Sequence, residues 1–184
     1  MSKQLNIAWA LTLFAAFGGY VLWKRGKQSN PPSLLNNDNM TTDPNLPRGY
    51  RNHNPLNIRI SNNEWRGKIT PSGDPAFEQF ISMPYGYRAA LVLMRNYITK
   101  YNCNTVQRII ERWAPPTENN TLAYIQHVCD YSGLKPDTVV NENDKDTLTK
   151  MAYAMSIIEN GNTEYTRMFG LPNMEIINEG WRLI

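Results

Sequence analysis

The sequence predicts an α+β fold that is mostly helical, carries a small antiparallel sheet, and is preceded by one transmembrane helix. Three observations support this prediction. Residues 7–23 contain no charged side chain, short apolar runs broken by Asn, Gly and Pro fill residues 48–82, and helically spaced apolar residues follow from Tyr87. The 184 residues therefore divide into a membrane anchor (1–25), a flexible linker (26–47) and a folded domain (48–184).

The uncharged run is the candidate membrane anchor. At about 1.5 Å per helical residue it is ~25 Å long, near the short limit for a ~30 Å hydrocarbon core. Lys24, Arg25 and Lys27 follow it at once, a stop-transfer pattern that also places the domain on the cytoplasmic side. A cleaved signal peptide is the alternative, but the apolar run continues past its loosely fitting cleavage pair, Ala16 and Gly18. We therefore expect an uncleaved anchor.

The linker and the sheet are predicted from composition and from short apolar runs. The linker is rich in Asn, Pro, Ser, Thr and Asp, and few of its side chains are apolar enough to bury. After it, three apolar runs separated by turn residues predict strands at Leu56–Ile60, Trp65–Ile69 and Ala76–Ile81. We expect these strands to form the small antiparallel sheet.

Five helices are predicted after the sheet. Leu91, Met94 and Ile98 share one face of the first helix, and residues that commonly cap or stop a helix bound the later ones. The predicted ranges are Tyr87–Tyr101, a helix capped by Thr105 that ends at Trp113, one capped by Asn120 or Thr121 and stopped at Gly133, Asn143–Glu159 stopped by Gly161, and Met174–Trp181.

Composition and charge exclude several classes of function. The net charge of +3 comes from 19 basic and 16 acidic residues, and no Lys/Arg run follows residue 27, so nucleic-acid binding is not expected. Cys103 and Cys129 lack the spacing of a zinc site, and His53 and His127 lie far apart in the sequence. The HExxH, P-loop and GxGxxG patterns are absent from the sequence. We therefore expect neither a metal nor a cofactor.

A polar cluster at Arg48–Arg59 (RGYRNHNPLNIR) is the first candidate binding site. It places Asn52, Asn54, Asn57 and Arg59 in one short loop. An Asn side chain offers both a donor and an acceptor, which suits sugar hydroxyls and N-acetyl amides. Turn formation is the alternative, because Asn and Pro are also common loop residues, and composition alone favours it.

A second cluster, WAPPTENNTLAYI at residues 113–125, offers a candidate general acid. Glu118 lies in the predicted loop between two helices, beside Asn119 and Asn120. Partial desolvation near Trp113 would raise the pKa of this carboxyl towards the value that a general acid needs. Alternatively, Glu118 only interacts with the dipole of the next helix.

Three further acids border the predicted strands. Glu64 precedes Trp65 in a predicted hairpin, and Asp74 and Glu78 flank an apolar run. Acidic side chains at such positions are mostly solvated, so we expect surface acids here.

Five segments resemble one known family, in the right order. RGYRNHNPLNIR at 48–59 and RWAPPTENNTLAYIQHV at 112–128 enclose W-x-G at Trp65–Gly67, F-x-x-F at Phe77–Phe80 and G-x-R-A at Gly86–Ala89. The family is that of phage and prophage proteins with a lysozyme-like, peptidoglycan-degrading domain, and the resemblance covers residues 48–135 approximately. His53 and Leu56 depart from the family pattern, which has Asn and Gly at these two positions.

The resemblance implies a lysozyme-like domain that cleaves the glycan strands of peptidoglycan, by hydrolysis or by the lytic transglycosylase route. Either route needs an acid that protonates the glycosidic oxygen. Lysozyme-like enzymes usually carry this acid just before the sheet, where this chain has only Asp38 and Asp43 of the linker. Glu118 is therefore the first candidate acid and Asp74 the second. The candidate substrate-binding residues are Asn52, Asn54, Asn57, Arg59, Trp113, Asn119 and Asn120.

An anchor joined to such a domain predicts a membrane-anchored phage virion protein that degrades peptidoglycan locally during infection. The expected locations are the membrane of the phage particle and, during assembly, the inner membrane of the host. The expected partners are the lipid bilayer, peptidoglycan and capsid proteins. One alternative is a structural virion membrane protein whose domain binds capsid or glycan without catalysis, and another is an anchored bacterial hydrolase that faces the periplasm.

Overall fold

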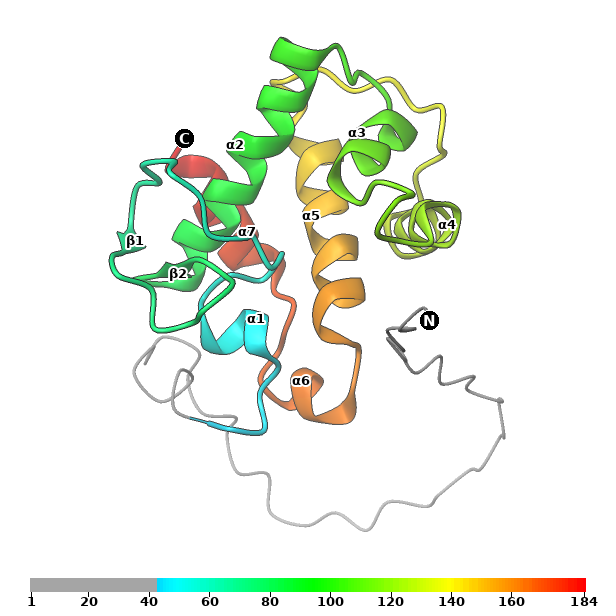
Figure 1. Ribbon diagram of the computed structural model, residues 1–184. Helices are drawn as coiled ribbons and strands as arrows, with labels where there is room; N and C mark the ends of the chain where they lie inside the picture. Colours follow the sequence, from blue (N-terminus) through cyan, green and yellow to red (C-terminus); the bar gives the residue numbers. More distant parts are fainter. Residues whose placement is uncertain (1–42) are drawn as a thin grey trace, which may run out of the picture. The chain divides into compact units, whose positions relative to one another are not determined.

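A computed structural model describes residues 43–184 of the chain (Figure 1). This part is mostly helical with a two-stranded antiparallel sheet, which confirms the predicted α+β class. Its elements are α1 (Arg48–Arg51), β1 (Lys68–Ile69), β2 (Gln79–Phe80), α2 (Met83–Tyr101), α3 (Val106–Trp113), α4 (Thr121–Ser132), α5 (Lys145–Asn160), α6 (Glu164–Met168) and α7 (Met174–Arg182). No helix within residues 43–184 is long and apolar enough to cross a membrane. The predicted anchor (1–25) and most of the predicted linker (26–47) lie outside the described residues.

The core forms around α5, which runs through the middle of the helical part (Figure 1). α4 packs against α5, and α2 and α7 pack against each other and against α5. Leu148, Met151 and Met155 of α5 are fully buried, as are Leu91 and Met94 of α2. Each such side chain stabilises the fold by about 1.5–3 kcal/mol. Because α5 is packed by several neighbours, the residues at its C-terminal end are held in a fixed place.

The helix ends follow the predicted capping residues. The Thr105 hydroxyl accepts from the Arg108 N–H at 3.3 Å, and the Asn120 side chain accepts from the Ala123 N–H at 3.2 Å. Gly133 ends α4 in a left-handed conformation, at φ 71°. These predictions are confirmed. The sequence pattern does not predict α1 and α6, because helices of four and five residues are too short to show an apolar period.

Asp144 gives a test of these helix ends. Its carboxylate accepts a hydrogen bond from the Thr147 N–H at 3.1 Å, at the N-terminus of α5. Asp144→Ala should lower the free energy of unfolding by about 1 kcal/mol, the usual contribution of an N-cap side chain. Asp146→Ala is the matched control, because Asp146 is exposed and pairs with Lys150 of the same helix, so its loss should cost less than about 0.5 kcal/mol. Equal losses in urea unfolding would contradict the capping role.

The sheet is smaller than the sequence predicts. β1 and β2 pair over two residues each, and a single bridge joins Arg59 to Phe77. Loops replace most of the predicted strands, Leu56–Ile60, Trp65–Ile69 and Ala76–Ile81. The side-chain oxygens of Asn54, Asp74 and Glu78 explain the difference, because they accept from backbone N–H groups that a longer ladder would use.

The packed part begins before the domain boundary predicted at Arg48. Leu46 is 2% exposed and belongs to the hydrophobic core. Asp43 accepts a hydrogen bond from the hydroxyl of Tyr165 in α6. The folded unit therefore includes residues from at least Asp43 onward, and a fragment that starts at Arg48 would lose a core side chain.

Candidate active site

Glu159, at the C-terminal end of α5, is the candidate catalytic residue. Its side chain is partly buried. Burial raises the pKa of this carboxyl above its usual value, although hydrogen bonds from neighbouring side chains act in the opposite direction. A raised pKa keeps the group protonated over a wider pH range, which is the property that a general acid requires.

Three side chains donate hydrogen bonds to Glu159. The Tyr124 hydroxyl donates to Oε1 at 3.0 Å, and the Asn57 amide donates to Oε2 at 3.0 Å. The Trp113 indole N–H is the third donor. Asn57 lies in the first polar cluster of the sequence, whereas Trp113 and Tyr124 lie in the second. Two motifs that are far apart in the sequence therefore meet at one carboxyl group.

The surroundings of Glu159 exert two opposing effects on its proton. Burial disfavours the ionised carboxylate, so the protein without substrate retains the proton more strongly than an exposed Glu does. The three donors stabilise the carboxylate that remains once the proton has left. The Tyr124 hydroxyl stays protonated throughout, because burial raises its own pKa well above the usual value. The site can thus both hold a proton and release it to a substrate.

The backbone conformation of the first polar cluster places Asn57 against the C-terminal end of α5. Asn57 and His53 adopt left-handed backbone conformations, with φ of 50° and 49°, which Asn and His tolerate better than most residues. Asn160, the last residue of α5, donates to the Pro55 carbonyl at 2.7 Å. Gly49 permits this close approach, because a Cβ there would overlap the Asn160 side chain. The loop and the end of α5 are therefore held together.

The two departures from the family pattern fit this loop. A ring nitrogen of His53 lies 3.1 Å from the Phe80 carbonyl oxygen, so the side chain ties the loop to β2. Leu56 is 1% exposed and fills the core. Since the left-handed positions of this loop are His53 and Asn57, the backbone does not require a Gly at position 56.

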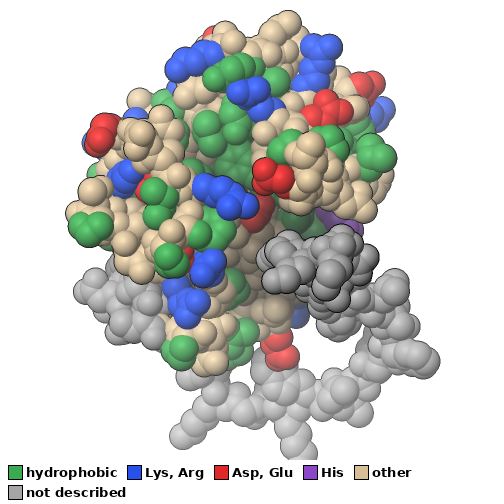
Figure 2. All heavy atoms as spheres, viewed as in Figure 1, with side chains coloured by type: hydrophobic (Ala, Val, Ile, Leu, Met, Phe, Trp, Pro, Cys, Tyr) green, Lys and Arg blue, Asp and Glu red, His purple; other side chains and the backbone are tan. Residues whose placement is uncertain are grey.

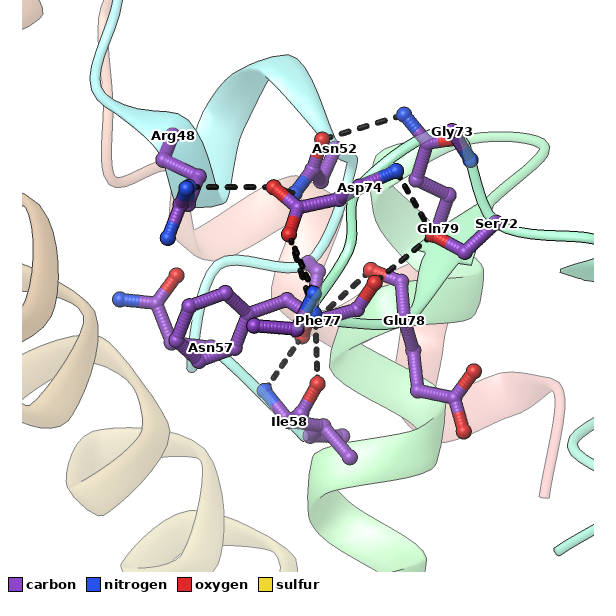
Figure 3. Close-up of polar contacts among 12 residues, drawn as sticks. Arg48, Asn52, Asn57, Ile58, Ser72, Gly73, Asp74, Phe77, Glu78 and Gln79 are labelled. Atoms are coloured by element: carbon purple, nitrogen blue, oxygen red, sulfur yellow. Dashed lines mark hydrogen bonds and ion pairs between the residues drawn. The ribbon is translucent and has the colours of Figure 1, made fainter. Parts of the chain in front are cut away.

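Asn52 and Asn54 have structural roles that differ from the predicted sugar binding. The Asn52 amide donates to Asp74 at 2.9 Å (Figure 3). Asn54 is fully buried, and its amide donates to the carbonyl oxygens of Ile58 and Glu78. Their donor groups are therefore used inside the protein, and the prediction is corrected for both. Of the three asparagines predicted in the first cluster, Asn57 is the one that contacts Glu159.

Asp74, the second predicted acid, is a structural ion-paired residue (Figure 3). Its carboxylate lies 3.0 Å from Arg48 Nε and accepts from the Ala76 and Phe77 N–H groups. Burial alone would raise the pKa of Asp74, but these hydrogen bonds and the Arg48 charge bring the pKa below its usual value. A readily ionised carboxyl is a poor proton donor. The prediction of a solvated surface acid is also wrong, because the Asp74 side chain is only 7% exposed.

Asp74→Asn should lower the free energy of unfolding by about 1.5–3 kcal/mol at neutral pH, because it removes charge-assisted hydrogen bonds. A lowered pKa gives stability that is present above the usual value of 3.8 and is lost as the pH falls through the value in the folded protein. The deficit of Asp74→Asn should therefore shrink in acid. Thermal unfolding across this range measures it, with exposed Glu64→Gln as control. A deficit that does not change with pH would contradict the assignment.

Glu78 is also buried, contrary to the prediction of a surface acid, whereas Glu64 is exposed as predicted. Glu78 lies 3.2 Å from the Lys68 ammonium group and accepts from the Ser61 N–H at 2.9 Å. In Figure 3 its carboxylate points away from that of Asp74. Glu78 therefore fastens the loop before β1 to β2 and takes no part in the Glu159 site.

Glu118, the first predicted acid, lies at the edge of the site and is well solvated. Its side chain is 64% exposed, and its Oε2 atom lies 3.9 Å from the Arg59 guanidinium group. The partial desolvation on which the acid assignment depended is absent, so the geometry favours Glu159 instead. Asn119 is exposed as well, and Asn120 caps α4.

A hollow lies in the middle of the face shown in Figure 2, with acidic and basic side chains around it. The contacts of Asn57 with Glu159 and of Arg59 with Glu118 join the loop before β1 to α5 and to the loop before α4.

A separate depression of about 500 Å³ is lined by Tyr97, Cys103, Arg108, Glu111, Arg112 and Pro115, and by neither Glu159 nor its donors. Within residues 43–184, no three His, Cys, Asp or Glu side chains come together as metal ligands.

Glu159 is not among the site residues predicted from the sequence, because it is the last residue of the predicted helix 143–159. One signal was present. The C-terminus of a helix carries a partial negative charge, so an acid there is unfavourable without a compensating reason. Glu159, followed by Asn160 and Gly161, is such an acid.

Comparison with known proteins relates the chain to a phage protein. No family model matches it. Protein P5 of Pseudoalteromonas phage PM2 is 37% identical over 122 residues, which make up 65% of this chain and 74% of the relative. This chain belongs to the Protein P5 family. The predicted relationship to phage proteins is thereby confirmed, whereas membership of the family does not by itself identify a reaction.

Proposed function

We propose that this member of the Protein P5 family is a phage virion protein that cleaves the glycan strands of peptidoglycan, with Glu159 as the general acid. The convergence of Asn57, Trp113 and Tyr124 on a partly buried carboxyl with a raised pKa carries the proposal. Perturbed carboxyl groups of this kind cluster at catalytic sites. Glycoside cleavage suits the site because it needs a protonated carboxyl that can give its proton to the glycosidic oxygen.

In the proposed mechanism, the glycosidic oxygen of the substrate lies against Glu159. Glu159 transfers its proton to this oxygen while the bond between the oxygen and the anomeric carbon breaks. The three donors stabilise the resulting carboxylate. That carboxylate then takes a proton from the hydroxyl group that attacks the anomeric carbon, so Glu159 returns to its protonated form.

The transglycosylase route suits the site better than hydrolysis. Hydrolases usually place a second carboxylate about 5–9.5 Å from the acid. In the described part of the chain, the two other candidate carboxylates already face guanidinium groups, Asp74 that of Arg48 and Glu118 that of Arg59. With one carboxyl, a hydroxyl of the substrate itself serves as the nucleophile and leaves a 1,6-anhydro end.

The spatial arrangement supports a lysozyme-like domain with a changed chain order. The resemblance implies an acid that precedes the sheet, whereas Glu159 follows β1 and β2 in the sequence. In space, the end of α5 is nevertheless bonded to the loop between α1 and β1, through Asn57 and Asn160. The acid thus adjoins the sheet side of the fold although it comes late in the chain.

The proposed location is the membrane of a phage particle, held by the predicted anchor in residues 1–25. From there the domain would act on peptidoglycan during infection, with the bilayer and capsid proteins as neighbours. A relative in phage PM2 supports the phage setting.

Digestion of purified peptidoglycan sacculi by the full-length protein tests the proposal. We expect soluble fragments whose masses correspond to 1,6-anhydro ends. Reducing ends would overturn the transglycosylase route and leave Glu159 as the acid of a hydrolase. Binding to sacculi without any soluble product would contradict the proposed reaction and favour the non-catalytic structural alternative.

A further inference from the structure

Arg59 lies at the edge of the same site, and its contacts contribute little to the stability of the fold. Its guanidinium group is 3.9 Å from Glu118, and both side chains are well exposed, at 75% and 64%. An exposed ion pair of this kind contributes at most about 1 kcal/mol. Another anion can therefore replace Glu118 at little cost.

The backbone of Arg59 is fixed although its side chain is exposed. Arg59 forms a bridge with Phe77, and its guanidinium group lies 5.9 Å from the centre of the Phe77 ring. Arg48, which is bound to Asp74, lies 5.1 Å from the same ring and helps to hold it. The guanidinium group of Arg59 is therefore exposed to solvent while the backbone that carries it is held in place.

Arg59 is also close to the proposed reaction centre. Asn57, two residues earlier, donates to Glu159. The Cα atoms of residues two positions apart are at most about 7 Å apart, so Arg59 is anchored close to the residue that contacts Glu159.

We infer that Arg59 binds a carboxylate of the peptide stem that peptidoglycan strands carry, so that the site prefers peptide-bearing glycan to unsubstituted glycan. The inference rests on the proposed function. A guanidinium group matches a carboxylate with two parallel hydrogen bonds. In the free protein the guanidinium group of Arg59 pairs with Glu118. The substrate carboxylate takes the place of Glu118 in this pair.

Cosedimentation with sacculi tests the inference without requiring turnover. The full-length Glu159→Gln variant is compared with the double variant Glu159→Gln, Arg59→Gln. Intact sacculi are used beside sacculi from which an amidase has removed the peptides. Loss of Arg59 should weaken binding to intact sacculi by about tenfold, the effect of one charge-assisted contact, and should leave binding to stripped sacculi unchanged.

Two further variants sharpen the result. Arg66→Gln is the matched control, because Arg66 is also exposed over an aromatic ring, 5.9 Å from the centre of Tyr85, and should change neither binding. Glu118→Gln should strengthen binding to intact sacculi, because it removes the competing carboxylate, and the gain should fall with added salt.

The possible outcomes separate the two proposals. Equal weakening on both kinds of sacculi would show that Arg59 contacts the sugar and would overturn the inference, as would no weakening on either. If the wild type digests nothing but the Arg59-dependent preference for peptide-bearing sacculi is present, the proposed reaction fails and the binding inference stands.

Discussion

Glu159→Gln should lower the rate of sacculus digestion by about 10²–10⁴-fold, the usual contribution of general acid catalysis. Gln has nearly the volume of Glu but has no proton to transfer. It also fits the site, because the Oδ1 atom of Asn57 is buried and has no hydrogen-bond partner among the described residues. Rotation of the Asn57 amide would let this oxygen accept from the new Gln. Circular dichroism and binding to sacculi should therefore be unchanged.

The same variant should gain stability relative to the wild type as the pH rises. A raised pKa gives stability that is complete below the usual Glu value of 4.5 and is lost as the pH rises through the value in the folded protein. Gln does not titrate. The melting temperature of the wild type should therefore fall relative to that of Glu159→Gln from about pH 4 upward. A Gln variant that is less stable at every pH would indicate a structural role for Glu159.

The two acids predicted from the sequence are the controls for this result. Glu118→Gln and Asp74→Asn also exchange a carboxyl for an amide and should leave the digestion rate at saturating substrate close to that of the wild type, measured where Asp74→Asn is folded. Loss of activity in Glu118→Gln, with an active Glu159→Gln, would return the acid to the loop before α4.

Gly86→Ala should destabilise the domain by about 3 kcal/mol or more, the largest stability effect that we expect. A Cβ at Gly86 would overlap the carbonyl oxygen of His53 and lie 2.9 Å from the Pro55 ring. Neither a backbone carbonyl nor a proline ring can turn away, so α2 and the loop that carries Asn57 would have to separate. Urea unfolding measures the loss, and digestion should fall with it because Asn57 would leave Glu159.

Gly133→Asn is the control for Gly86→Ala. A Cβ at Gly133 has no neighbour within 4 Å, and Asn tolerates the left-handed conformation at φ 71°. The loss should stay below about 1 kcal/mol. Similar small losses in both variants would contradict the close approach of α2 to the loop.

The helices were predictable because their ends are decided locally. Thr105, Asn120 and Gly133 bond or bend their own backbone within a few residues, so a capping rule finds them without a fold. The G-x-R-A motif was visible in the same way, but the need for Gly86 was not. That need arises from a contact with His53, which is distant in the sequence.

The candidate site was only partly predictable, because residue type does not reveal the direction of a side chain. Asn52, Asn54 and Asn57 looked alike in the sequence, yet Asn52 and Asn54 serve the fold and Asn57 contacts Glu159. Asn57 and Glu159 are 102 positions apart. Their contact depends on the packing of α1 against α5, which no local pattern encodes. The same holds for Glu118, whose exposure depends on tertiary structure.

Titration of Glu159 itself tests the central claim most directly. In full-length protein with ¹³C-labelled Glu, the carboxyl resonance that disappears in Glu159→Gln identifies the residue. We predict that this resonance titrates with a midpoint above 4.5, and that the same midpoint marks the alkaline decline of sacculus digestion. A midpoint at or below 4.5, or an alkaline decline that persists unchanged in Glu159→Gln, would contradict the assignment of Glu159 as the acid.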